Sequence, residues 1–304
     1  MTCRPLASTL ATVEIPPRRR GLWRAQGPGQ ARRRLVPNAF GVPDALVGLA
    51  AGFVLASVLV SAVAALSGHP GRTSGVGSDV ASLLGLWTGL VGAAVVASRR
   101  AARPGGEAPR APRPRRAGAG AGERAATRTG ARAAVALLRD DYGWTVRLWP
   151  DVPVGIAVGL VSQYALVPLF ELPLLPFVPH LFTRLGAPAV SLTSGAHGAG
   201  LVLLGVLVCL GSPVVEELYF RGLLLRGLAG RLAGLGGRLG PVLSVVVVGI
   251  VFGLVHFEAL QLLALVGFGV VLGALAWRTG RLGPGTVAHI AFNTAAFVSV
   301  ARAH

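Results

Sequence analysis

Residues 200–225 have the sequence GLVLLGVLVCLGSPVVEELYFRGLLL, an apolar run that carries Glu216, Glu217 and Arg221. Roughly 20 apolar residues in a helix cross a hydrocarbon core about 30 Å thick, so this stretch is long enough to span a membrane. An ionisable side chain costs roughly 2.5 to 3.5 kcal/mol at bilayer depth, and by default it indicates a functional site that faces the protein interior. The stretch therefore predicts a membrane helix with a polar site.

The same length rule identifies about seven apolar segments, which predict the fold class. Only helices and closed barrels satisfy their backbone groups in lipid, and barrel strands would alternate in polarity, so we expect helices. The predicted fold is all-α, a polytopic transmembrane helical bundle of about seven spans. The fourth segment could hold a kinked span or a span plus an interfacial helix, so the number lies between roughly six and eight. The segments are 45–66, 80–98, 152–170, 198–228, 241–257, 259–277 and 285–300.

Composition and charge agree with a membrane location. The chain has 304 residues, of which 53% are hydrophobic and 13% charged, as in a polytopic membrane protein. Its net charge of +17 comes from arginine alone, concentrated before Phe40 and within 99–147. Arginine-rich segments that flank membrane spans tend to stay cytoplasmic, so we expect membrane lipid as a partner and no nucleic acid. Arginine without lysine, beside abundant Gly and Ala, indicates a GC-rich bacterial genome. The predicted location is the bacterial cytoplasmic membrane, with a cytoplasmic N-terminus.

Changes in composition divide the chain into four regions. These are a basic tail at 1–39, a two-span hairpin at 40–98, an Arg/Pro/Gly-rich linker at 99–150 and a five-span core at 151–304. The linker buries too little apolar surface to fold and is expected to be largely disordered. The Pro-rich stretch 171–197 predicts a short interfacial helix with loops, which is either a plain connection or a lid.

Two further features exclude common alternatives. Cys3 and Cys209 are too few and too far apart to form a disulfide framework. The N-terminus lacks the pattern of a cleaved signal peptide, so the first span is expected to remain as an anchor.

Helical spacing predicts different roles for the two adjacent glutamates. Glu217 and Arg221 are four residues apart and can form an ion pair on one face of a helix. Glu216 points about 100° away from Glu217, so we expect it to face a different partner. Ser212 and Pro213 just upstream resemble a helix start or a kink.

Two later segments carry polar pairs at the same spacing. Phe252 and His256 lie in VVVVGIVFGLVHF, and His289 and Asn293 lie in TVAHIAFNTAAF. A carboxylate with two imidazoles and an amide offers a base for water, a group that positions the water, and donors for an oxyanion. Taken singly, each pair is more often structural: a buried histidine can be satisfied locally and an asparagine can bridge two helices. Together they favour peptide hydrolysis.

The order EExxxR, FxxxH and HxxxN resembles one family, the CAAX-protease and bacteriocin-processing (CPBP, Abi-type) intramembrane glutamic endopeptidases. The resemblance covers roughly 152–300 and implies an enzyme that hydrolyses a peptide bond of a membrane-associated protein or peptide without a cofactor. It implies that Glu216 is the general base and that His256 positions the water. His289 and Asn293 would stabilise the oxyanion, while the structural support would come from Glu217, Arg221 and Phe252.

Two other readings stay open. Glu216, His256 and His289 could supply three zinc ligands of a membrane metallopeptidase, although no HExxH motif occurs. The fold could also serve as a non-catalytic membrane scaffold or a bacteriocin-immunity factor. A transporter is less favoured, because the halves of the chain show no convincing internal similarity.

Overall fold

The computed structural model describes residues 41–68, 75–102 and 141–302, and every regular element within these ranges is helical. This confirms the predicted all-α fold class. The basic tail at 1–39 and most of the predicted linker at 99–150 lie outside the described residues.

The N-terminal hairpin consists of α2 (Gly41–Leu66) and α3 (Val76–Ala102), which contain the first two predicted spans. Glycines let the two helices approach closely. A Cβ atom on Gly48 would lie 2.3 Å from the Ala93 Cβ, and one on Gly89 would lie 2.3 Å from the Gly52 backbone nitrogen. Small residues commonly drive such contacts between membrane helices, because dispersion contacts between backbones replace the missing hydrophobic driving force.

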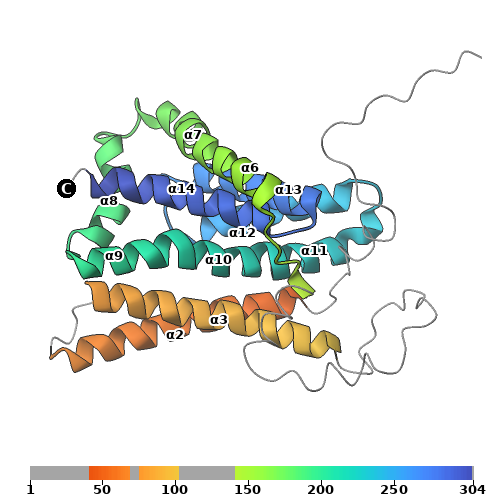
Figure 1. Ribbon diagram of the computed structural model, residues 1–304, viewed down its shortest axis with the longest axis horizontal. Helices are drawn as coiled ribbons and strands as arrows, with labels where there is room; N and C mark the ends of the chain where they lie inside the picture. Colours follow the sequence, from red (N-terminus) through yellow and green to blue (C-terminus); the bar gives the residue numbers. More distant parts are fainter. Residues whose placement is uncertain (1–40, 69–74, 103–140, 303–304) are drawn as a thin grey trace, which may run out of the picture.

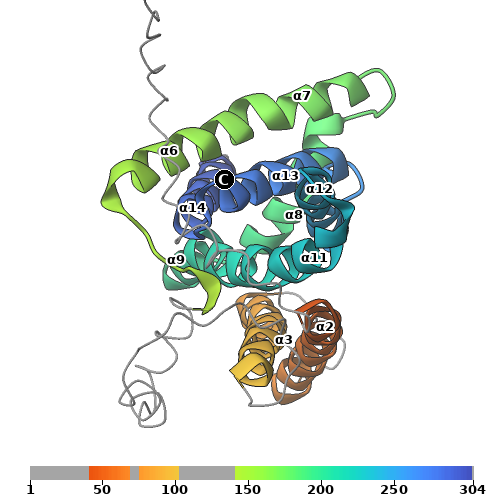
Figure 2. The ribbon, with the colours of Figure 1, turned by 90° about the vertical axis from the view of Figure 1, so that its right-hand side faces the viewer.

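The third predicted span is a helical run with changes of pitch. It comprises α6 (Leu148–Val161), the π-helix η1 (Ser162–Leu166), α7 (Val167–Glu171) and the short 3-10 helix η2 (Leu172–Leu174). After a turn, α8 (Leu181–Thr193) provides the short helix expected from the Pro-rich stretch. The structure places α8 across one end of the bundle, between α7 and α9, as the two ribbon views agree (Figures 1 and 2).

The fourth segment forms one unbroken helical run from Ala199 to Leu235. Its parts are α9 (Ala199–Val206), η3 (Leu207–Gly211), α10 (Ser212–Glu216), η4 (Glu217–Leu224), α11 (Leu225–Arg231) and η5 (Leu232–Leu235). Both η3 and η4 have π-helical hydrogen bonding, whereas η5 is a 3-10 helix.

No new helix starts at Ser212 and Pro213, because the helix continues through them. Gly211 and Ser212 both have right-handed helical backbone angles, and the wide turn of η3 immediately precedes Pro213. A π-helical turn accommodates the proline because it shifts the hydrogen bonds around the missing N–H. Of the two expectations for this site, the helix start is therefore wrong.

The last three predicted spans are α12 (Leu239–Leu254), α13 (Leu262–Thr279) and α14 (Gly283–Ala301). Two glycines let α12 and α13 pack at short range, since a Cβ on Gly269 would lie 2.9 Å from the Gly249 Cα. A Cβ on Gly273 would lie 3.2 Å from a Val245 side-chain carbon, and one on Gly267 would lie 2.9 Å from the Phe170 ring. These glycines therefore serve contacts within one chain.

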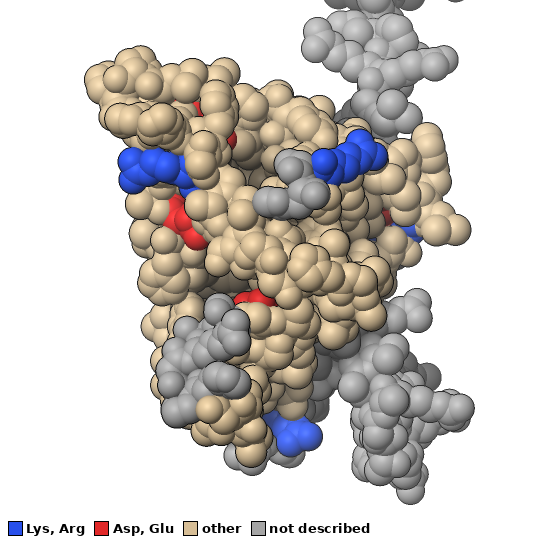
Figure 3. All heavy atoms as spheres, turned by 90° about the vertical axis from the view of Figure 1, so that its left-hand side faces the viewer, with Lys and Arg blue, Asp and Glu red and all other residues tan. Residues whose placement is uncertain are grey.

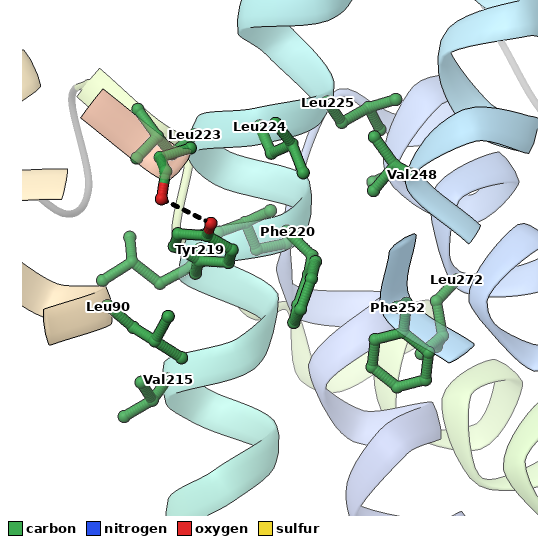
Figure 4. Packing of buried hydrophobic residues seen from close by; sticks show 14 of the residues in the cluster. Leu90, Val215, Tyr219, Phe220, Leu223, Leu224, Leu225, Val248, Phe252 and Leu272 are labelled. Carbon is green, nitrogen blue, oxygen red and sulfur yellow. Dashed lines mark hydrogen bonds between the residues drawn. The ribbon is translucent and has the colours of Figure 1, made fainter. Parts of the chain in front are cut away.

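The α9–α11 helix lies between the hairpin and the remaining helices (Figures 1 and 2). Its buried face carries Tyr219, Phe220 and Leu223, which pack with residues of the hairpin on one side and of α12 and α13 on the other (Figure 4). The Tyr219 hydroxyl donates a hydrogen bond of 2.7 Å to the Ala45 carbonyl oxygen of α2. The helix with the polar motif is thus held from both sides.

Among the described residues, five helical runs are long and apolar enough to cross a membrane. They are 41–66, 76–100, 148–174, 199–235 and 262–279, and α12 is a shorter apolar helix. Large apolar side chains face outward, for example Val47 and Val54 on α2, which are 70% and 62% exposed. Lipid would cover this apolar outer surface, so the protein is a multi-pass membrane protein.

Arginines gather at one end of the bundle. Arg99 and Arg100 end α3, Arg231 ends α11 and Arg278 lies in the last turn of α13, and these helix ends lie on the same side (Figure 1). The opposite end, with the C-terminal end of α14, shows only scattered charged side chains (Figure 3). That this end faces the cytoplasm stays a prediction from the positive-inside tendency.

Tyr142 lies just before α6 and forms hydrogen bonds with the hairpin. Its buried hydroxyl donates to the Ala94 carbonyl oxygen at 2.6 Å and accepts from Ser98 Oγ at 3.0 Å. Burial raises the pKa of Tyr142 from 10.0 to about 12.

We expect this phenol to make stability pH-dependent at alkaline pH. Because the folded pKa is higher than the unfolded one, the stabilisation is complete below about pH 10 and is lost as pH rises through about 12. Thermal unfolding in detergent should therefore show a decline in the melting temperature across this range that is smaller in Tyr142→Phe. An equal decline in both proteins would contradict the assignment.

Candidate functional site

Glu216 and Glu217 lie at the junction of α10 and η4 and share one partner, His289 of α14. Glu217 Oε1 lies 3.2 Å from His289 Nδ1, and Glu216 Oε2 lies 3.8 Å from His289 Nε2. Glu217 is completely buried, whereas the Glu216 side chain is 16% exposed. Glu216 thus lies outside the Glu217–Arg221 ion pair, as helical spacing predicts, whereas the position of both carboxylates beside His289 was not predicted. Because the two imidazole nitrogens lie on different edges of the ring, one histidine can meet both carboxylates.

Arg221 forms the ion pair with Glu217 that the four-residue spacing predicts. Its Nη1 lies 2.9 Å from Glu217 Oε1, and both side chains are fully buried. Its Nη2 donates to the Gly269 carbonyl oxygen of α13 at 3.0 Å, and its guanidinium carbon lies 4.6 Å from the centre of the Phe252 ring. These contacts compensate part of the cost of burying the charge and join the first motif to α12 and α13.

Phe252 is the residue at which the three motifs meet. The centre of its ring lies 4.6 Å from that of His256 and 5.6 Å from that of His289. It also packs edge-on against Phe220 of η4 at 5.2 Å (Figure 4). Segments that are distant in the chain therefore converge around one aromatic side chain.

His256 follows the C-terminal end of α12 and is held by the turn before it. Its Nδ1 lies 2.6 Å from the Phe252 carbonyl oxygen. A carbonyl only accepts hydrogen bonds, so Nδ1 carries the proton and the neutral ring keeps an acceptor lone pair on Nε2. His256 contacts Phe252, and the Phe252 ring in turn packs against residues of the other motifs. Among the described residues, His256 forms no hydrogen bond or ion pair with Glu216.

Asn293 lies one turn after His289 on α14 and satisfies a backbone carbonyl that Pro213 leaves without a donor. The Ser212 N–H donates to the Leu207 carbonyl, the π-helical pattern. In that pattern the next carbonyl, of Val208, would accept from residue 213, but proline has no N–H. Asn293 Nδ2 donates to Val208 O at 3.0 Å instead. Asn293 thus bridges two helices through a hydrogen bond, one of the roles considered for it. The second N–H of its side-chain amide is not used in this hydrogen bond.

Three residues that the motifs did not identify also shape the site. Phe268 of α13 packs edge-on against the His289 ring at 5.4 Å, and Gly269 supplies the carbonyl for Arg221. At Gly285 a Cβ would lie 2.9 Å from Glu217 Oε2, so a side chain there would press on the carboxylate. The repeated glycines in GFG at 267–269 and GPG at 283–285 were the only sequence signal for close packing here.

Two buried carboxylate oxygens, Glu216 Oε2 and Glu217 Oε2, have no hydrogen-bond partner among the described residues. Unsatisfied buried acceptors are costly and are found at functional sites. Within the same part of the chain, no three His, Cys, Asp or Glu side chains are grouped so that they could hold a metal ion. The zinc reading, which needed Glu216, His256 and His289 as joint ligands, finds no support in this geometry.

Comparison with known protein families shows a match to the family described as type II CAAX prenyl endopeptidase Rce1-like, at residues 198–295. The matched segment runs from the start of α9 into α14 and contains all seven motif residues. No curated protein and no solved structure matches the chain. The resemblance predicted from the three motifs is confirmed, because residues 198–295, which carry all three motifs, match the model of the Rce1-like type II CAAX prenyl endopeptidase family.

Proposed function

We propose that the protein is a membrane endopeptidase that hydrolyses a peptide bond of a membrane-associated protein or peptide, with a water molecule activated by Glu216. One observation carries the proposal: an unsatisfied Glu216 oxygen lies 3.8 Å from the His289 imidazole inside a membrane bundle. The match to an endopeptidase family supports the reaction class.

Glu216 is suited to the role of general base. A carboxylate oxygen without a competing donor can accept the proton of a water molecule as that water attacks the peptide carbonyl. The proton then passes to the leaving amine when the carbon–nitrogen bond breaks, so the carboxylate is regenerated. The 16% exposure of the Glu216 side chain, against complete burial of Glu217, favours Glu216 as the carboxylate that a water reaches.

Glu217 is suited to orienting His289. The carboxylate at His289 Nδ1 fixes the ring and favours a proton on that nitrogen, as the aspartate of a serine-protease triad does for its histidine. His289 Nε2 is then directed toward Glu216, at a separation too long for a hydrogen bond. In the protonated ring this nitrogen would donate to the oxyanion of a tetrahedral intermediate. Glu217 therefore has a role beyond its ion pair with Arg221.

His256 and Asn293 complete the proposed machinery. His256 would hold the attacking water through its Nε2 lone pair, since its Nδ1 is occupied by the Phe252 carbonyl. Asn293 would offer its second amide N–H to the oxyanion while the first stays on Val208 O. Donors fixed by such contacts need little reorganisation during the reaction.

Comparative proteomics of membranes tests the proposal and identifies the substrate. Cells that contain the wild-type protein should lose a peptide bond in a membrane-associated protein, and cells with Glu216→Gln should accumulate the uncut form. Glu171→Gln, which changes a carboxylate on α7 outside the family match, should behave as wild type. Identical membrane proteomes in all three strains would favour a non-catalytic scaffold or immunity factor instead.

A chelator experiment separates the proposal from a metallopeptidase. Cleavage of the identified substrate by purified protein should be unchanged after treatment with EDTA or phenanthroline. Activity that is lost on chelation and restored by added zinc would contradict the glutamate-activated mechanism.

A further inference from the structure

A groove of about 670 Å³ runs along the outer side of the contact between α6 and α14. Its α6 wall, which continues into η1, is a stripe of side chains four residues apart: Val152, Ile156, Leu160 and Tyr164. Its α14 wall runs from Val287 to Arg302. His289 and Asn293 are not among the lining residues, so the groove is distinct from the candidate active site.

The groove exists because the two helices touch along one line and their larger side chains flank it. At the line of contact, a Cβ on Gly159 would lie 2.3 Å from the Ala288 carbonyl oxygen, and one on Gly155 would lie 2.6 Å from the Val287 Cβ. Beside this line the side chains leave a channel whose walls are almost entirely apolar. Since both helices belong to the membrane bundle, the channel opens toward lipid.

The groove is long enough for one extended acyl chain. From Val152 to Tyr164 the α6 wall covers 13 residues, about 18 Å of helix from the first to the last, and from Val287 to Arg302 the α14 wall covers 16 residues, about 22 Å. One leaflet of a hydrocarbon core of about 30 Å is about 15 Å thick, so the groove can hold one acyl chain of that leaflet along its whole length. A partner helix would need a contact across the whole core and small residues for close approach. The α14 wall has small residues, Ala291, Ala295 and Ser299, but the α6 wall carries Val, Ile, Leu and Tyr, which would keep a second helix at a distance.

The end of the groove provides the head-group contact. Arg302 lies at the C-terminal end of α14, is exposed, and its guanidinium has no hydrogen bond or ion pair with any described residue. Arginine binds phosphate through two N–H groups of its planar guanidinium.

We propose that this groove binds one anionic glycerophospholipid, with an acyl chain between α6 and α14 and its phosphate on Arg302. The lipid belongs to the leaflet at the C-terminal end of α14. It would cover the lipid-facing side of the helix that carries His289 and Asn293. This inference is independent of peptidase activity, because it concerns the opposite side of α14.

Native mass spectrometry of the full chain in detergent, titrated with dipalmitoyl-phosphatidylglycerol or dipalmitoyl-phosphatidylcholine, tests the proposal. Wild-type protein should bind the anionic lipid more tightly. Arg302→Gln should weaken that binding about fivefold, the effect of one arginine at an anionic lipid surface. Ala295→Trp, which fills the groove, should remove binding of both lipids.

Two variants serve as matched controls. Arg184→Gln removes an exposed arginine of α8, and Val202→Trp enlarges a 67% exposed residue of α9 outside the groove, so both should bind as wild type. Equal affinity of wild type and Arg302→Gln for the anionic lipid would overturn the proposal, as would unchanged binding by Ala295→Trp. If Ala295→Trp cannot be purified, the affinity of Arg302→Gln for the anionic lipid still tests the proposal. This variant should fold, because an exposed arginine is not needed for folding.

Discussion

Replacement of Glu216 by Gln is expected to lower kcat/KM for peptide hydrolysis by about a hundredfold to ten-thousandfold, the usual contribution of a general base. The amide has the shape of the carboxylate but cannot take a proton from water. The measurement is cleavage of the proteomically identified substrate by purified protein in detergent, with wild type and variant at equal concentration.

The fold should tolerate this substitution. Glu216 Oε2 accepts no hydrogen bond from the described residues, so the neutral amide loses no native bond. Thermal unfolding should therefore give similar melting temperatures for both proteins, which separates loss of chemistry from loss of structure. The mechanism would be wrong if Glu216→Gln retained wild-type turnover in the same preparation.

His256 provides a second comparison with the same substrate. His256→Ala is also expected to abolish cleavage, because the water would lose the Nε2 acceptor that positions it. Its ring lies outside α12 and packs mainly on Phe252, so the helices should remain inserted. An active His256→Ala protein would leave Glu216 as base but would require another group to hold the water.

The helices were predictable because span length and the absence of charge are local properties. Each of the seven apolar segments contains a helix, and 171–197 contains the short α8. The continuation through Pro213 was not predictable, because it depends on a carbonyl of Val208 that Asn293 satisfies from another helix. A non-local hydrogen bond leaves no trace in the local pattern.

The sequence predicted which residues form the candidate site, but not the contacts that these residues make between helices. Spacing predicted the Glu217–Arg221 pair, because that contact lies within one helix. The convergence of Glu216 and Glu217 on His289 depends on how α14 packs against α10 and η4, which the geometry of a single helix cannot predict. The contributions of Phe268 and Gly269 arise in the same way from packing of α13.

Replacement of Glu217 by Ala is expected to lower the free energy of unfolding by about 3 to 5 kcal/mol, the cost of leaving a buried charge without its partner. Arg221 is fully buried, and the Gly269 carbonyl and the Phe252 ring do not neutralise its charge. The measurement is thermal or denaturant unfolding in detergent. The yield of folded protein should fall in parallel.

A double variant separates the two roles of Glu217. Glu217→Gln together with Arg221→Met removes both charges at similar volume, so it should recover most of the stability lost in Glu217→Ala. If Glu217 also orients His289, the double variant should stay poorly active despite its stability, because an amide at His289 Nδ1 no longer favours a proton on that nitrogen. Wild-type kcat in a stable double variant would instead confine Glu217 to its ion pair with Arg221, and the orientation of His289 would then depend on its aromatic neighbours Phe252 and Phe268.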